Sequence, residues 1–141
     1  MKKISVKLVI AALLFATGLQ AQSLQDGVND YYAERFKSAK STFEKLIAAN
    51  PNNIEANYWL GQTYFVRGQY EKAAKSFLEG YQAYPKSAKA PDYLLKIGSS
   101  LAKINQKEDA CAVFAELKSK YPNSPVAKER MPAEKKAAGC K

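Results

Sequence analysis

The chain has 141 residues, a formal net charge of +9 and no histidine. The lack of histidine excludes Ser–His and Cys–His catalytic pairs and histidine-bound metals. A glycine-rich phosphate loop is also missing, and the two cysteines lie 29 residues apart without other soft ligands. Lysine and arginine are interspersed with acidic residues along the chain, which is typical of solvated helix faces rather than a nucleic-acid site. We expect no enzyme, no metal, no cofactor and no nucleic-acid partner.

Residues 1–21 are predicted to be a cleaved signal peptide. Three lysines precede an unbroken apolar run from Leu8 to Ala16, and Ala21 supplies the small residue before the cleavage point. The run is about half of the roughly 20 apolar residues that a membrane-spanning helix needs. We therefore expect cleavage between Ala21 and Gln22, export to the periplasm, and no membrane span in the mature chain.

A spacing of small and aromatic residues occurs three times in the rest of the chain. In the middle unit, Gly61 and Ala73 are followed by Phe77 and Pro85, and Gly68 separates two helical patterns. Moved back by 34 residues, the frame falls on Gly27, Ala39, Phe43 and Pro51; moved forward by 37, it falls on Gly98, Ala110, Phe114 and Pro122.

This order of glycine, alanine, aromatic residues and proline matches the tetratricopeptide signature. The sequence predicts an all-α fold, a right-handed superhelical stack of three such repeats followed by a capping helix. The repeats are expected over about 22–51, 52–85 and 86–122, within a domain of residues 22–124. The expected core residues are Gly27, Ala39, Phe43, Leu60, Gly61, Tyr64, Ala73, Phe77, Gly98, Ala110 and Phe114.

Local signals place the helix ends. Asn52 is the expected N-cap of the first helix in the middle repeat. The three additional residues between Pro85 and Gly98 are expected to lengthen the next helix by about one turn. Its start, at Ser87 or at Pro91, remains open at this point.

Residues 125–141 are expected to form the capping helix and a tail. Ser124-Pro125 is a typical helix start, and Pro132 predicts a kink or break near Met131. An even number of cysteines in an exported chain favours a disulfide between Cys111 and Cys140, which would clamp the cap onto the repeats. The alternative is two free thiols.

The first helix of each repeat is expected to line a concave groove that binds a partner. Exposed aromatic rings beside amide and hydroxyl groups suit an extended or helical peptide, and a lysine at one end favours an acidic group on it. Tyr32 and Tyr58 are the aromatic residues expected to be most exposed. The predicted groove residues are Tyr32, Tyr58, Gln62, Phe65, Leu95, Ser99 and Lys103.

Three segments carry a resemblance to a known family. Residues 56–62 (ANYWLGQ), 84–90 (YPKSAKA) and 114–122 (FAELKSKYP) resemble the C-terminal tetratricopeptide domain of the Tol–Pal-associated YbgF/CpoB family, the cell-division coordinators. The resemblance implies a periplasmic adaptor that binds the Tol machinery during division. The family's N-terminal coiled coil has no counterpart between Ala21 and the first repeat.

Two functions are therefore expected from the sequence. The first is a protein–protein interaction adaptor that binds a segment of an envelope protein, with a Tol–Pal component as one possible partner. The alternative is a structural subunit or assembly factor of an outer-membrane complex, because outer-membrane assembly lipoproteins also use tetratricopeptide repeats with Tyr-Pro-Asn-Ser turns, as at residues 121–124.

Overall fold

The computed structural model describes residues 23–141, so the predicted signal peptide and the Ala21–Gln22 cleavage site lie outside the described residues. Within residues 23–141 the chain forms helices and turns and no strand. None of the helices in this part is long and apolar enough to cross a membrane. A first helix covers residues 23–32 and is followed by α2 (Phe36–Ala49), α3 (Ile54–Val66), α4 (Tyr70–Ala83), α5 (Ala90–Lys103), α6 (Lys107–Lys120), η1 (Val126–Arg130) and α7 (Met131–Ala137).

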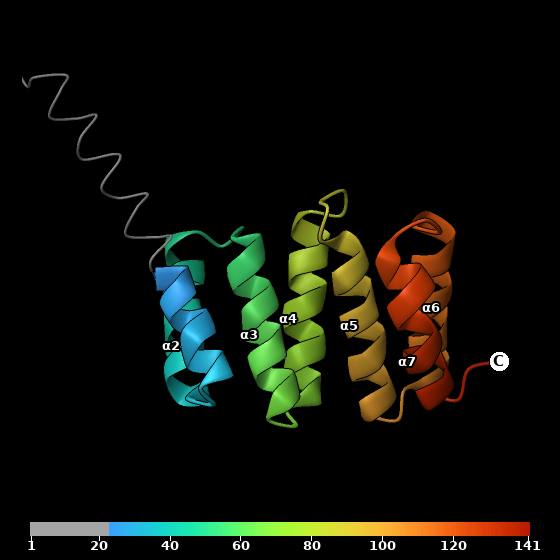
Figure 1. The fold of residues 1–141 in the computed structure, drawn as a ribbon, viewed down its shortest axis with the longest axis horizontal. Coiled ribbons are helices and arrows are strands. Elements are labelled where there is room, and N and C mark those ends of the chain that lie inside the picture. Colours follow the sequence, from blue (N-terminus) through green and yellow to red (C-terminus); the bar gives the residue numbers. More distant parts are fainter. Residues whose placement is uncertain (1–22) are drawn as a thin grey trace, which may run out of the picture.

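The helices form consecutive pairs that stack in chain order. Helix α3 packs on α4, and α5 packs on α6, while α2 contacts α3 and α4 contacts α5 to join the pairs. Figure 1 shows the resulting row of upright helices, from the blue first helix and the teal α2 to the red C-terminal segment. The predicted all-helical superhelical stack is confirmed.

One glycine and one phenylalanine define the contact inside each pair. Phe43, Phe77 and Phe114 are fully buried. A β-carbon on Gly61 would lie only 2.5 Å from Phe77 Cε1, and the equivalent glycines of the other two pairs are as tightly covered. The phenylalanine ring therefore requires a glycine opposite it. All other residues of the expected core are buried except Tyr64, which is half-buried with Lys40 and Lys72 over its ring.

The junctions between successive pairs follow a second size rule. Leu46 of α2 lies in one buried cluster with Ala56 of α3, and Leu117 of α6 lies in another with Ala127 of the cap. At the middle junction the sizes are reversed. Gly80 occupies the position of the leucine, and Tyr93 occupies the position of the alanine. The fully buried Tyr93 ring fills the space that a side chain at position 80 would take.

Two boundary predictions were wrong. Helix α5 has 14 residues and α3, the equivalent helix of the middle repeat, has 13, so the three-residue insertion does not lengthen α5 by a turn. The insertion forms a longer turn instead, closed by backbone bonds from Ser87 to Tyr84 and from Ala90 to Ser87. The cap of α3 is Asn53 rather than Asn52, because the Asn53 side chain is the one that accepts from the Ala56 amide.

The C-terminal cap begins as the sequence predicts but is not broken at Pro132. Ser124 Oγ accepts from the Ala127 amide at 3.1 Å, as an N-cap does. A π-helical turn, η1, precedes the proline, and the Met131 amide donates to the Val126 carbonyl five residues earlier. Such a widened turn accommodates the missing N–H of a proline. The helix therefore continues through α7 to Ala137.

Candidate functional site

The first helices of the repeats form one continuous surface, which we call the first-helix face. It consists of residues 23–32, α3, α5 and α7. Side chains meet across it from one repeat to the next. The rings of Tyr31 and Trp59 lie 5.2 Å apart, and Lys96 Nζ lies 5.2 Å from the centroid of the Phe65 ring. The surface of this face is therefore shaped by contacts between neighbouring first helices and not by any one helix alone.

An aromatic cluster lies at the N-terminal end of this face. The ring of Tyr32 lies 5.4 Å from Tyr31 and 5.7 Å from Trp59, both in edge-to-face geometry. Tyr32 is 71% exposed, whereas the other two rings are half-buried. The exposure predicted for Tyr32 thus agrees with the structure, and Trp59 is an additional aromatic residue beside it.

The exposure predicted for Tyr58 was wrong. Tyr58 is only 8% exposed, and its ring lies 5.7 Å from both Phe77 and Tyr93. Lys89 Nζ covers the remaining side at 4.5 Å from the ring centroid. Burial raises the pKa of the Tyr58 hydroxyl. Tyr58 is buried because α5, from the next repeat, brings Tyr93 against α3.

Two predicted groove residues of α5 are covered by the C-terminal cap. Leu95 is 2% exposed and belongs to the buried cluster that includes Ala127 and Met131. Ser99 is 5% exposed, and its Oγ lies within hydrogen-bonding distance of the Leu95 carbonyl and of Glu134 Oε2. Leu95 is closed to a partner and Ser99 is left only a small exposed area, because η1 and α7 pack directly on α5.

The open part of the face is centred on Phe65. Its half-buried ring contacts Tyr70 edge-to-face at 5.1 Å and carries the Lys96 ammonium group above it. Burial, followed by the charge of Arg130, lowers the pKa of Lys96. Gln62 lies one turn before Phe65 on α3, and its Oε1 is buried with no hydrogen-bond partner in the described part of the chain.

A pocket of about 500 Å³ opens beside Phe65, which we call the α3–α5–α7 pocket. Alanines provide much of its apolar lining, and Lys103 and Glu134 supply opposite charges. Lys103, the lysine predicted at one end of the groove, is exposed. The residues that line the pocket are Phe65, Ser99, Ala102, Lys103, Glu134, Ala137 and Ala138.

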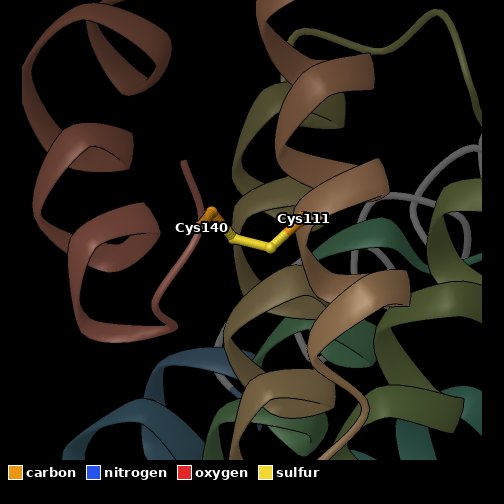
Figure 2. Close-up of a disulfide and its surroundings, with 2 residues drawn as sticks. All are labelled: Cys111 and Cys140. Carbon is orange, nitrogen blue, oxygen red and sulfur yellow. A yellow bond between two sulfur atoms is a disulfide. The ribbon is translucent and has the colours of Figure 1, made fainter.

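A disulfide holds the α7 wall of this pocket in place. Cys111 of α6 is bonded to Cys140, with their Cα atoms 5.6 Å apart. Figure 2 shows the tail turning back after α7 so that Cys140 meets the side of α6. Of the two alternatives left open by the sequence, the structure therefore has the bond and not the free thiols. The bonded Cys140 lies two residues beyond Ala138, which lines the pocket.

Family comparisons agree with this architecture. Two models described as tetratricopeptide repeat match residues 24–88 and 92–124, together well over half of the chain. The chain belongs to the tetratricopeptide-repeat family. No curated protein gives a significant match to this tetratricopeptide-repeat protein.

Several solved tetratricopeptide structures have the same fold. The Pseudomonas aeruginosa protein PcrH has a TM-score of 0.77 and 19% identity, with 87% of this chain and 93% of PcrH covered. The Yersinia enterocolitica type III secretion chaperone SycD, in complex with a peptide of the translocator YopD, has a TM-score of 0.75 and 20% identity, with 84% and 91% covered. The second tetratricopeptide domain of human RPAP3, in complex with an HSP70 peptide, has a TM-score of 0.68 and 18% identity, with 84% and 97% covered. At these identities the likeness concerns the fold alone.

Two charged residues of the cap, Arg130 and Glu134, were not predicted from the sequence, whereas Lys103 was. Arg130 is paired with Asp92, and Glu134 accepts from Ser99, so η1 and α7 are each tied to α5. A signal for Arg130 exists in the repeat frame. Arg130 lies 34 residues after Lys96, which is one repeat length, so the cap continues the register of the first helices.

Proposed function

We propose that this protein is an exported, non-enzymatic adaptor that binds an extended segment of an envelope protein on its first-helix face. The observation that supports this proposal is the α3–α5–α7 pocket, which lies at the junction of three first-helix elements and has both apolar and charged lining. Aromatic and apolar surface supplies contact area, and the charged groups at its edge orient a partner.

The fold neighbours support the same type of function. SycD and RPAP3 were each solved with a peptide of another protein, and PcrH was also solved with the chaperone-binding region of PopD. In this chain the exposed Tyr32 and the half-buried Phe65 provide separate apolar contacts along one face. A peptide that reaches both would cross the first two repeats.

The envelope setting of the proposal comes from the signal sequence and the resemblance to the YbgF/CpoB family. A Tol–Pal component is therefore the partner we propose first, with a role in cell division or envelope maintenance. The disulfide is compatible with this setting, because structural disulfides persist in oxidising compartments such as the periplasm.

Capture of partners from an envelope extract tests the proposal. The oxidised protein is compared with a double variant on the first-helix face, Tyr32→Ala with Phe65→Ala. The matched control removes two exposed apolar side chains at α4, Leu78→Ala with Tyr84→Ala. We expect the same captured proteins with wild type and control and their loss with the first variant.

The melting temperature of each variant shows whether the fold is retained. If both double variants captured the same proteins as the wild type, the binding site would lie on another surface and the proposal would be contradicted. A Tol–Pal protein among the specifically captured proteins would support the division role. Stoichiometric co-purification with an outer-membrane assembly complex, unaffected by either variant, would favour the structural-subunit alternative.

A further inference from the structure

Lys96 is a half-buried cation without an ion-pair partner among the described residues. The two nearby carboxylates have other partners: Asp92 is paired with Arg130, and Glu134 accepts from Ser99 Oγ at 2.8 Å. The contact recorded for the ammonium group is with the face of the Phe65 ring. Buried charges are normally paired, so an anion beside Lys96 would complete the site.

The electrostatic environment of Lys96 agrees with this. Burial is the main cause of its lowered pKa and the Arg130 charge acts in the same direction, while Glu134 and Asp92 only partly oppose them. The surroundings therefore disfavour the charged ammonium group in the free protein. A carboxylate placed against it would remove that penalty.

Gln62 presents a second unmet group on the same part of the face. Its Oε1 is buried and accepts no hydrogen bond from the described residues. Gln62 and Phe65 are three residues apart on α3, so their side chains are neighbours on one face of the helix. The oxygen is enclosed in this conformation, and a change of the Gln62 rotamer would bring it to an N–H donor of a bound backbone.

Three features therefore meet around Phe65 within the described part of the chain: a cation without an ion pair, an acceptor without a donor, and a pocket that is partly apolar. We propose that the first-helix face recognises an extended peptide with an acidic side chain on Lys96, a backbone N–H on Gln62, and an apolar side chain in the α3–α5–α7 pocket. In an extended peptide, side chains two residues apart point the same way. The recognised pattern is an Asp or Glu separated by one residue from an apolar residue.

An acidic side chain fits this arrangement better than a C-terminal carboxylate. A terminal carboxylate shares its Cα with the side chain in the pocket and would lie at the pocket itself, beside the Glu134 carboxylate. Lys103 also lines the pocket but is exposed, so an ion pair there would contribute little. An acid two residues away would lie outside the pocket, where the Lys96 ammonium group over the Phe65 ring has no ion-pair partner among the described residues.

This inference rests on the proposed peptide-binding function, and selection from random peptides separates the two. Random 12-residue peptides are selected on the oxidised full-length mature protein in two formats, one with free and one with amidated C-termini. The variants are Lys96→Gln, the conservative Lys96→Arg, and a matched control at an exposed position of α6, Lys118→Gln. Melting temperatures confirm that each variant is folded.

We expect wild type, Lys118→Gln and Lys96→Arg to enrich the acid–x–apolar pattern, in either direction, in both formats. Lys96→Gln should lose at least tenfold of the acidic enrichment while retaining the apolar preference. Enriched peptides without an acidic residue, or an enrichment confined to free C-termini, would overturn the inference but leave the adaptor function intact. Failure of wild type to enrich any peptide would contradict the adaptor function and the inference together.

Discussion

The ring of Tyr93 lies directly against Gly80, and its hydroxyl donates to the carbonyl oxygen of Ile54 at 2.6 Å. Tyr93 thus bridges α4 and α3 from its position on α5. The other two junctions place a leucine and an alanine at these positions instead. At the middle junction the large side chain, Tyr93, therefore lies on the later of the two helices and the small one, Gly80, on the earlier.

The reversed sizes predict a compensating pair of substitutions. Tyr93→Ala alone should destabilise the protein by roughly 3–5 kcal/mol through the cavity it leaves. Gly80→Leu alone should also destabilise it, because the new side chain would overlap the Tyr93 ring. The double variant, which copies the leucine–alanine pair, should recover at least half of the combined loss in a urea titration. Strict additivity of the two losses would contradict the size rule.

A similar coupling is expected between Gly61 and Phe77. Gly61→Ala should cost about 1–3 kcal/mol, because its β-carbon would lie 2.5 Å from the Phe77 ring. Phe77→Ala should cost about 3–5 kcal/mol. In the Phe77→Ala background the ring is absent, so Gly61→Ala should become neutral or stabilising, as alanine is in most helices.

An exposed residue on the same helix as Phe77 provides the control for that cycle. Lys75 is 78% exposed, and its ion pair with Glu79 is long at 3.9 Å. Lys75→Ala should therefore change the free energy of unfolding by less than about 0.5 kcal/mol. A loss as large as that of Phe77→Ala would show that the denaturant titration does not report on the core.

The disulfide should contribute substantially to the stability of the cap. The bond closes a segment with a sequence separation of 29, which is worth about 3–4 kcal/mol in the chain-entropy model. Unreduced protein should show no reactive thiol, and reduction should lower its melting temperature. A double Cys111→Ser and Cys140→Ser variant should be insensitive to reductant. Two reactive thiols in exported, unreduced protein would refute the bond.

Stability should fall at alkaline pH because of Tyr93. Burial raises the pKa of its hydroxyl far above the ordinary value of 10.0. Below pH 10 the hydroxyl is neutral in both states and its contribution is complete. Above pH 10 it ionises in the unfolded chain but not in the folded one, so folding becomes less favourable as the pH rises.

The variant Tyr93→Phe isolates this effect. It should lose about 1 kcal/mol at neutral pH with the hydrogen bond to Ile54, and its stability should fall less steeply above pH 10. Lys96, whose pKa is lowered, and Tyr58, whose pKa burial raises, are present in both proteins, so the difference between the two alkaline slopes reports on Tyr93. Identical alkaline slopes in urea titrations would contradict the prediction.

Processing of the N-terminus is a separate prediction from the sequence. Cleavage after Ala21 should give a mature chain that begins at Gln22, because the basic start, the short apolar run and the small residue fit a signal peptide. The intact mass of protein isolated from its native cells checks this. Retention of residues 1–21 would contradict export by this route.

The candidate site was only partly predictable from the sequence. The position of Phe65 and of Gln62 on one helix face follows from their spacing alone. The burial of Tyr58 does not, because it depends on Tyr93 from the next repeat. Ser99 was expected to face a partner, but its hydroxyl bonds to Glu134, 35 residues further along the chain.

The amino-acid sequence by itself determined the helix pairs and their number. Gly61 and Phe77 meet within one repeat, and helical periodicity between nearby positions is enough to specify such a contact. Only the tertiary structure decided which first-helix residues remain open. That choice depends on how closely neighbouring repeats approach and on single side chains such as Tyr93, which bonds to a carbonyl 39 residues away. The tertiary structure also showed that Lys96 has no ion pair within residues 23–141, since ion pairing depends on distances that residue spacing along the chain does not specify.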